Sequence, residues 1–188
     1  MNNKFKILEF LARNQGEKFT IHELSKLASI PYATLYREIK KFEDLVKKKK
    51  VGKATTIQIN QKNPLTKHYL IIASEKKAED FVKKHPLFKK IKTELPKGKY
   101  SVVLFGSYAK GTKRKTSDID LLIINKSGKK KPSFSKYETI FKITINPIYI
   151  TKKEFKIMLT EKEENIGKQA LENHIVLHNP ELFWELVI

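Results

Sequence analysis

The chain contains no cysteine, only two methionines and one tryptophan, and 20 acidic side chains against 39 basic ones. The lack of cysteine excludes a disulfide framework, cysteine-ligated zinc, an iron–sulfur cluster and a thiol nucleophile. No segment approaches the roughly 18 uninterrupted apolar residues that a membrane span needs, and the first residues lack the apolar run of a signal peptide. We therefore expect a cytoplasmic protein without a membrane partner.

The chain is strongly basic, with a formal net charge of +19 over 188 residues. Hydrophobic residues at 40% and aromatic residues at 10% are too many for a disordered polycation, so the chain is expected to fold as one large or two small domains. The basic excess includes clusters at 47–50, 113–115 and 129–131. Each cluster could be a solvated loop. Because the clusters occur together with a DNA-binding motif, they favour nucleic acid as the partner. Neutralisation of phosphates by basic side chains is the main source of non-specific affinity for nucleic acid.

The first third has the pattern of a helix-turn-helix. Apolar residues recur at helical spacing over 5–12, and Thr20 stands three residues before Glu23, which is a capping-box arrangement that predicts the start of a second helix. After a short turn over 28–30, Pro31 suits the start of a third helix, where its missing N–H costs nothing.

The third helix is predicted to have a buried stripe and a polar face. Its stripe consists of four apolar residues at helical spacing: Leu35, Ile39, Phe42 and Val46. Early residues on the opposite face of such a helix can reach base edges in the major groove, while later lysines hold phosphates. The candidate DNA-binding residues on this face are Thr34, Tyr36, Arg37, Lys40 and Lys41.

A basic β-wing is expected after this helix, because the lysines at 47–50 precede an alternating segment at 55–59. The segment SIPYATLYREIKKFEDL resembles the recognition unit of winged-helix transcription factors, although no glycine separates helix and wing. The resemblance implies a winged helix-turn-helix domain over 1–63 that binds duplex DNA. A plain three-helix cluster with a lysine-rich surface and a dimerisation or protein-docking module are the alternatives. Residues 64–96 are expected to form a helical connector, broken at Pro86.

Two aspartates open a strand in the second half of the chain. The β-branched and aromatic segment 100–105 runs into Gly106 and Ser107, and a second apolar segment follows Ser117. Because side chains alternate along a strand, Asp118 and Asp120 are expected on one face, about 6–7 Å apart. Paired carboxylates favour Mg²⁺, and a nucleoside triphosphate would supply further oxygens. A solvated strand edge is the plain alternative for an isolated Asp-x-Asp.

The residues of the glycine turn distinguish between two kinds of phosphate-binding site. A Walker P-loop would need lysine directly after the second glycine, whereas Gly111 is followed by Thr112. The combination GSYAKG and SDIDLL resembles the nucleotidyltransferase superfamily of DNA polymerase beta, and most closely its minimal single-domain members, over about 97–188. The resemblance implies an α+β chain whose second domain has a mixed sheet flanked by helices. It also implies Mg²⁺ at the catalytic pair Asp118 and Asp120. The implied nucleotide contacts are Gly106, Ser107 and Ser117.

The family normally supplies a third carboxylate from a neighbouring strand. The candidate strand at 143–150 contains no acid, and Asn146 is the expected occupant of that position. An amide oxygen can ligate a metal but cannot accept a proton at neutral pH. Glu138 and Glu154 are alternative carboxylates, with Glu154 better explained as the partner of Thr151 in a capping box.

Two functions follow from these patterns. The first is a Mg²⁺-dependent nucleotidyltransferase that transfers a nucleoside monophosphate from ATP or another NTP to an acceptor hydroxyl, with DNA bound by the N-terminal domain. Minimal relatives often modify a toxin partner, so a protein acceptor is implied by resemblance. The second is a DNA-binding transcriptional regulator whose degenerate transferase domain binds a nucleotide or a partner.

Overall fold

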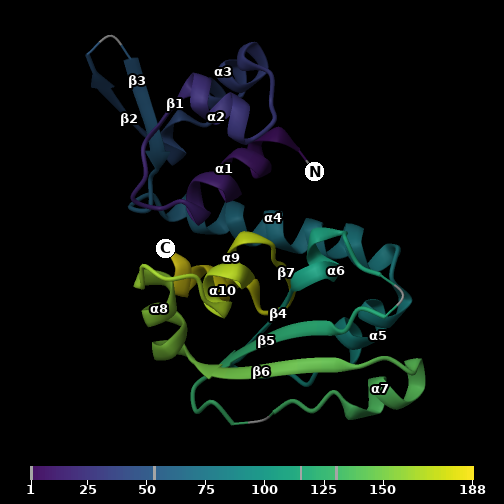
Figure 1. The fold of residues 1–188 in the computed structure, drawn as a ribbon. Helices are drawn as coiled ribbons and strands as arrows, with labels where there is room; N and C mark the ends of the chain where they lie inside the picture. Colours follow the sequence, from purple (N-terminus) through teal and green to yellow (C-terminus); the bar gives the residue numbers. More distant parts are fainter. Residues whose placement is uncertain (1, 53, 115, 130) are drawn as a thin grey trace. The chain divides into compact units, whose positions relative to one another are not determined.

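The structure is a computed structural model that describes residues 2–52, 54–114, 116–129 and 131–188. The chain divides into two compact units, residues 1–73 with Ile188 and residues 74–187 (Figure 1). The division falls inside the long helix α4 (Pro64–Lys83), which contributes residues to both units. The boundaries expected from the sequence, 1–63, 64–96 and 97–188, place this helix in a connector, and they stay a prediction.

The first unit combines helices with a small antiparallel sheet. Its helical elements are α1 (Asn3–Arg13), α2 (Ile21–Leu27), α3 (Tyr32–Lys41) and the short 3-10 helix η1 (Glu43–Leu45). Its strands are β1 (Phe19–Thr20), β2 (Val46–Val51) and β3 (Ala54–Ile59), in the order β1-β3-β2. Helices α2 and α3 form the helix-turn-helix, and the β2–β3 hairpin is the basic wing that the sequence predicts.

Hydrogen bonds between neighbouring residues stabilise the start of α2 and the turn before α3. The Thr20 hydroxyl accepts a hydrogen bond from the Glu23 backbone N–H at 3.2 Å, and the Glu23 carboxylate accepts one from the Thr20 N–H at 2.7 Å. This reciprocal bonding confirms the predicted capping box. In the turn before α3, Ser29 adopts φ 52°, and the Ser25 hydroxyl donates to the Ile30 carbonyl at 2.7 Å.

The four residues of the predicted stripe are buried as expected, but the last two lie outside the third helix. Leu35, Ile39, Phe42 and Val46 are all buried. However, α3 ends at Lys41, Phe42 leaves the helical region with φ −140°, and Val46 begins strand β2. A buried residue at position 46 fits both structures, because a strand also buries every second side chain.

The second unit is built on a four-stranded sheet of order β6-β5-β4-β7. Strands β5 and β6 are parallel, and the other two pairs are antiparallel, so the sheet is mixed as expected. Its strands are β4 (Ser101–Phe105), β5 (Ile119–Asn125), β6 (Ile145–Thr151) and β7 (Ile175–His178). Its further helices are α5 (Pro86–Glu94), α6 (Gly106–Lys110), α7 (Ser135–Phe141), α8 (Lys152–Thr160), α9 (Ile166–Glu172) and α10 (Pro180–Val187).

One face of this sheet carries a continuous apolar core. Leu104 on β4 and Leu121 on β5 point into it together with Phe88 of α5 and Tyr137 of α7. Since side chains alternate along a strand, Phe105 and Asp120 lie on the opposite face. In the part of the chain that the structure describes, no helix has both the length and the apolar character needed to cross a membrane.

Candidate functional site

Three segments meet at one end of the central strands. Phe105, the last residue of β4, pairs with Asp120 of β5, and the chain then turns into α6 at Gly106. On the other side of β5, the parallel register sets Asn146 of β6 directly beside Asp120. The structure therefore brings the predicted glycine turn, the predicted aspartates and the position expected for a third acid into one place.

Gly106 is required by this arrangement. Its φ of +66° is unfavourable for any residue with a side chain, and a Cβ built there would clash with Asp120 Oδ2 and lie 3.1 Å from Asp120 Cγ. The backbone thus approaches the carboxylate more closely than any other residue type would allow.

The two carboxylates differ in their surroundings. Asp118 is exposed, whereas Asp120 is half-buried. Burial raises the pKa of Asp120 above its usual value, the negative charge of Asp118 adds to this rise, and a hydrogen bond from Asn146 opposes it. The Asn146 amide nitrogen also lies 3.5 Å from Asp118 Oδ2. A bound cation would relieve the electrostatic cost of holding both carboxylates ionised.

The groups at this site suit a hard divalent cation. Asp118 and Asp120 offer carboxylate oxygens, and Asn146 offers an amide oxygen if its side chain turns, which are ligand types that Mg²⁺ prefers. Among the described residues, no group of three or more His, Cys, Asp or Glu side chains is placed to hold a metal ion. The donor set is therefore two carboxylates and one amide, to which phosphate oxygens of a substrate can be added.

The two predicted serine contacts have different local roles. Ser107 lies in the first turn of α6 and is half-buried. The Ser117 hydroxyl accepts a hydrogen bond from the Arg114 backbone N–H at 2.8 Å, which holds the loop that leads to Asp118. Their contact with a nucleotide stays a prediction.

The alternative carboxylates both have structural partners. Glu138 on α7 accepts a hydrogen bond from the Ile145 N–H at 3.0 Å and so ties α7 to the start of β6. Glu154 accepts from the Thr151 N–H at 2.6 Å, and its own N–H donates to the Thr151 hydroxyl at 3.1 Å. This bonding confirms the interpretation of Glu154 as a helix cap, and it lowers the pKa of Glu154.

An open pocket of about 350 Å³ adjoins α6, and sequence reasoning did not find it. Its walls include the rings of Phe88, Tyr108 and Phe141 together with His85 and Lys113. Lys113 Nζ lies 4.8 Å from the centre of the Tyr108 ring. Burial, with the nearby charges of Lys113 and Lys84, lowers the pKa of His85. The lining residues come from separate segments, so no local motif marks the pocket.

The predicted DNA-contact face of α3 is exposed except at Thr34, which is half-buried. Lys41 forms an ion pair with Glu38 at 2.7 Å, and Lys40 Nζ lies 4.7 Å from the centre of the Tyr36 ring. Within the described residues, Arg37 and Lys40 have no carboxylate within 4.0 Å. Arg37 Nε donates to the Ala33 carbonyl at 3.3 Å, so neither of these two side chains has its charge neutralised by an acid of the described chain.

Comparison with known proteins finds one family model for each end of the chain. A family model described as a nucleotidyltransferase domain matches residues 85–179, which include all the candidate site residues of the second unit. A family model described as the Mga helix-turn-helix domain matches residues 1–65. Neither the curated proteins nor the solved structures contain a match to the chain. With half of its length matched, the chain belongs to the nucleotidyltransferase domain family, and it carries an N-terminal helix-turn-helix domain of the Mga type.

Proposed function

We propose that the second unit is a Mg²⁺-dependent nucleotidyltransferase that moves a nucleoside monophosphate from ATP, or another NTP, to an acceptor hydroxyl. The observation that carries this proposal is the position of Asp120, which lies against Gly106 on one side and beside Asn146 on the other. With Asp118 two residues away, the site offers two carboxylates next to backbone that only glycine can form.

In this reaction the acceptor oxygen forms a bond to the α-phosphorus, the bond from that phosphorus to the bridging oxygen breaks, and pyrophosphate leaves. The hydroxyl proton passes to a base or to water. Mg²⁺, when bound, would neutralise phosphate charge and align the attacking and leaving oxygens. Asp118 and Asp120 would hold the cation, and Gly106 with Ser107 and Ser117 would face the phosphates. By the resemblance to minimal family members, we propose a protein hydroxyl, such as one on a toxin partner, as the acceptor.

Asn146 supports a second candidate function. It sits in register with Asp120, where a third carboxylate would accept the hydroxyl proton, and an amide cannot do so. A site of this kind can bind a nucleotide and react slowly. The chain would then be a DNA-binding regulator that responds to a nucleotide or a partner, with α3 as its DNA-contacting helix.

The test uses the purified full chain with MgCl₂ and ATP labelled at the α-phosphorus, with cell extract as a source of acceptors. Mg²⁺-dependent ATP binding is measured by equilibrium dialysis, and transfer is measured as label on a macromolecule. Label transferred from α-labelled but not from γ-labelled ATP identifies nucleotidyl transfer.

Two substitutions and one control locate the activity. Asp118→Asn and Asp120→Asn should each abolish Mg²⁺-dependent binding, while Asp80→Asn, an exposed acid of α4 in the same unit, should leave it unchanged. Binding with no transfer supports the regulator. No ATP binding by the unaltered chain, or binding that neither site substitution weakens, contradicts the nucleotidyltransferase and the regulator that responds to a nucleotide.

A further inference from the structure

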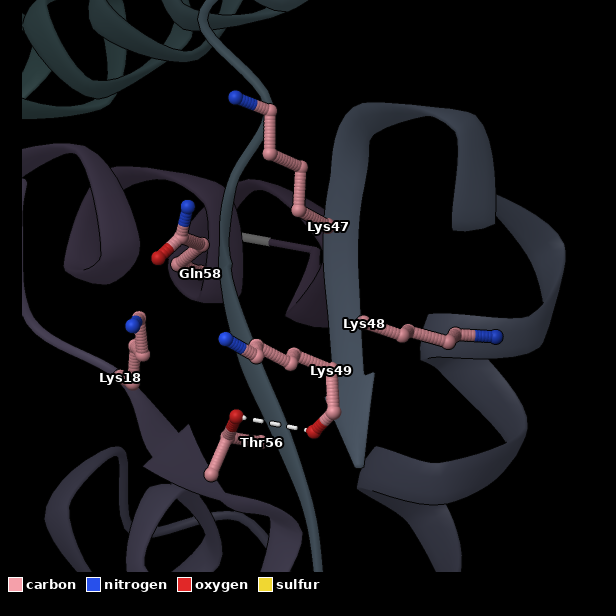
Figure 2. A pocket seen from close by; sticks show the side chains of 6 residues that line it. All are labelled: Lys18, Lys47, Lys48, Lys49, Thr56 and Gln58. Carbon is pink, nitrogen blue, oxygen red and sulfur yellow. Dashed lines mark hydrogen bonds between the residues drawn. The ribbon is translucent and has the colours of Figure 1, made fainter. Parts of the chain in front are cut away.

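Two open pockets of the chain contain lysine side chains but differ in their other residues. The pocket of the first unit, of about 460 Å³, is lined by Lys18, Lys47 and Lys49, among others, and Figure 2 shows Lys48 directed to the other side of strand β2. None of the described residues that line it is aromatic. The pocket beside α6 in the second unit combines lysines with aromatic rings, and these rings restrict the class of ligand that can fill it.

We call the pocket beside α6 the ring pocket. It is lined by residues 84–87 at the junction of α4 and α5, by Phe88 of α5, by Tyr108 of α6 and Lys113 after it, and by Phe141, the last residue of α7. All of these residues belong to the second unit. The volume of about 350 Å³ is in the range of sites that bind small molecules.

Two rings of the pocket are fixed in the core, and a third is at the surface. Phe88 is 1% exposed and Tyr108 is 8% exposed, and their ring centres lie 5.5 Å apart with planes inclined by 65°. Phe141 is 37% exposed. The buried rings therefore form a preformed wall, and a ligand that packs on Phe141 removes apolar surface from water.

The charged side chains that line the ring pocket are all basic. Lys113 Nζ lies 4.8 Å from the centre of the Tyr108 ring. Burial lowers the pKa of His85, and the charges of Lys113 and Lys84 lower it further, so both ammonium groups lie near this ring. Among the described residues, neither lysine has a carboxylate within 4.0 Å, and no acid lines the pocket. A ligand in the pocket therefore meets two positive charges that no protein carboxylate neutralises.

We propose that the ring pocket binds a planar aromatic ring that carries a negatively charged group, at a site separate from the paired aspartates. The ring packs against Phe141 and the two buried rings, since aromatic rings favour edge-to-face and offset-stacked contacts. The anionic group lies beside Lys84 and Lys113, because charge-assisted hydrogen bonds are stronger than neutral ones. A positively charged ring is repelled by the lysines, and a phosphate without a ring leaves the aromatic walls uncovered.

The fold separates the ring pocket from Asp120. Phe88 and Tyr108 belong to the apolar core on one face of the sheet, whereas Asp120 lies on the opposite face. The two sites are nevertheless close, because burial raises the pKa of Tyr108 and the negative charge of Asp118 adds to that rise. The ring pocket is thus a neighbour of the carboxylate site with walls of its own.

The test uses 4-fluorophenyl phosphate as the probe and the full chain without MgCl₂ or ATP. Broadening of the fluorine NMR signal of the probe measures binding, with an expected dissociation constant of about 1 mM or below for a ligand of this size. Two matched compounds test the chemistry. 4-Fluorobenzylamine has the same ring with the opposite charge and should not bind, and inorganic phosphate in excess should not displace the probe.

Two pairs of variants locate the probe. F141A removes the exposed ring, and I140A removes an exposed neighbour that does not line the pocket. K84A/K113A removes both cations, and K47A/K49A removes two lysines from the pocket that has no ring. F141A should weaken probe binding by about fivefold and K84A/K113A by about tenfold or more, while both controls change it by less than about twofold.

The proposal is overturned if neither F141A nor K84A/K113A weakens binding, if a control weakens it equally, or if 4-fluorobenzylamine binds as well as the probe. Circular dichroism checks that each variant is folded, and F141L and K84Q/K113Q repeat the measurement with side chains of similar size.

A last arm separates this site from the proposed nucleotide site. Asp120→Asn should leave probe binding unchanged, and saturating probe should leave Mg²⁺-dependent ATP binding in place. Loss of probe binding in Asp120→Asn, or displacement of the probe by ATP, would make the ring pocket part of the nucleotide site and overturn the separate site. Failure of the chain to bind ATP contradicts the proposed function, while the probe titration decides the ring pocket independently.

Discussion

Gly106 lies so close to Asp120 that a single added methyl group would strike the carboxylate. The contact joins the end of β4 to the second residue of β5, which pair across the sheet at Phe105 and Asp120. The glycine is therefore part of the geometry of the carboxylate site, in addition to its role in the turn.

Gly106→Ala should abolish Mg²⁺-dependent ATP binding, because the new methyl group displaces Asp120. Gly111→Ala is a matched control, since Gly111 also has a positive φ, of 76°, but a Cβ there meets nothing within 4 Å. The control should cost only the backbone strain, about 1 kcal/mol. Isothermal titration and thermal unfolding measure the two effects. Similar nucleotide affinities in the two variants would contradict the role given to the Gly106–Asp120 contact.

Asn146→Asp should raise nucleotidyl transfer by about a hundredfold, because it places a proton acceptor beside Asp120. The measurement is the initial rate of label transfer at fixed Mg²⁺ and ATP. Asn179→Asp adds the same charge at the start of α10, where aspartate can also accept the Leu182 N–H, and it should leave the rate unchanged. Fast transfer by the unaltered chain that Asn146→Asp does not increase would assign the proton acceptor to another group.

Arg37→Ala with Lys40→Ala should weaken duplex DNA binding and make its salt slope shallower by about 2, because two phosphate contacts are lost. Lys41→Ala should have a smaller effect, since Glu38 already pairs with that lysine. K153A/K156A removes two exposed lysines of α8 in the second unit and serves as the charge-matched control. Anisotropy titrations at several salt concentrations measure the slopes. An unchanged slope in R37A/K40A would move DNA contact away from α3.

A fragment ending at Ala73 should be more stable than one ending at Lys62. The longer fragment retains Leu70, which is fully buried, and the Thr66 hydroxyl, which donates to the Asn60 carbonyl at 2.7 Å. Burial of one leucine contributes about 2 kcal/mol. Thermal unfolding of the two fragments compares them, and equal midpoints would instead support a boundary near residue 63.

Glu94 should make the second unit sensitive to acid. It accepts hydrogen bonds from Lys90 at 2.6 Å and Lys136 at 2.8 Å, which lower its pKa from 4.5 to about 2, the bond from Lys136 having the larger effect. Because the folded state favours the ionised carboxylate, its stabilisation is present above pH 4.5 and is lost as the pH falls to about 2.

The measurement compares unfolding midpoints of Glu94→Gln and the unaltered chain between pH 7 and pH 2. The variant should be less stable at pH 7, and the difference should vanish near pH 2. Glu79→Gln, an exposed acid on α4, should show no such dependence. A difference that stays constant with pH would mean that the carboxylate charge does not stabilise the fold.

Several features could be read from the sequence because they depend on a few neighbouring residues. The capping boxes at Thr20 and Thr151 were predicted from spacing alone and are present in the structure. The break between α4 and α5 at Pro86 also followed from local pattern, whereas the mixed α+β class was expected from the resemblance to the nucleotidyltransferase superfamily. The end of α3 could not be predicted in this way, because a buried residue at Val46 suits a helix or a strand equally.

The contacts that Asn146 and Gly106 make with Asp120 could not be predicted from the sequence. The chain shows that its second half carries paired aspartates after a glycine turn and that one later strand lacks an acid. It does not show that Asn146 pairs with Asp120, or that Gly106 touches that carboxylate. Strand register is decided by which faces are buried together across long sequence separations, and a shift by one residue would turn Asn146 to the opposite face. Tertiary packing therefore decided the site, while local hydrogen bonding and side-chain alternation had already determined the elements that form it.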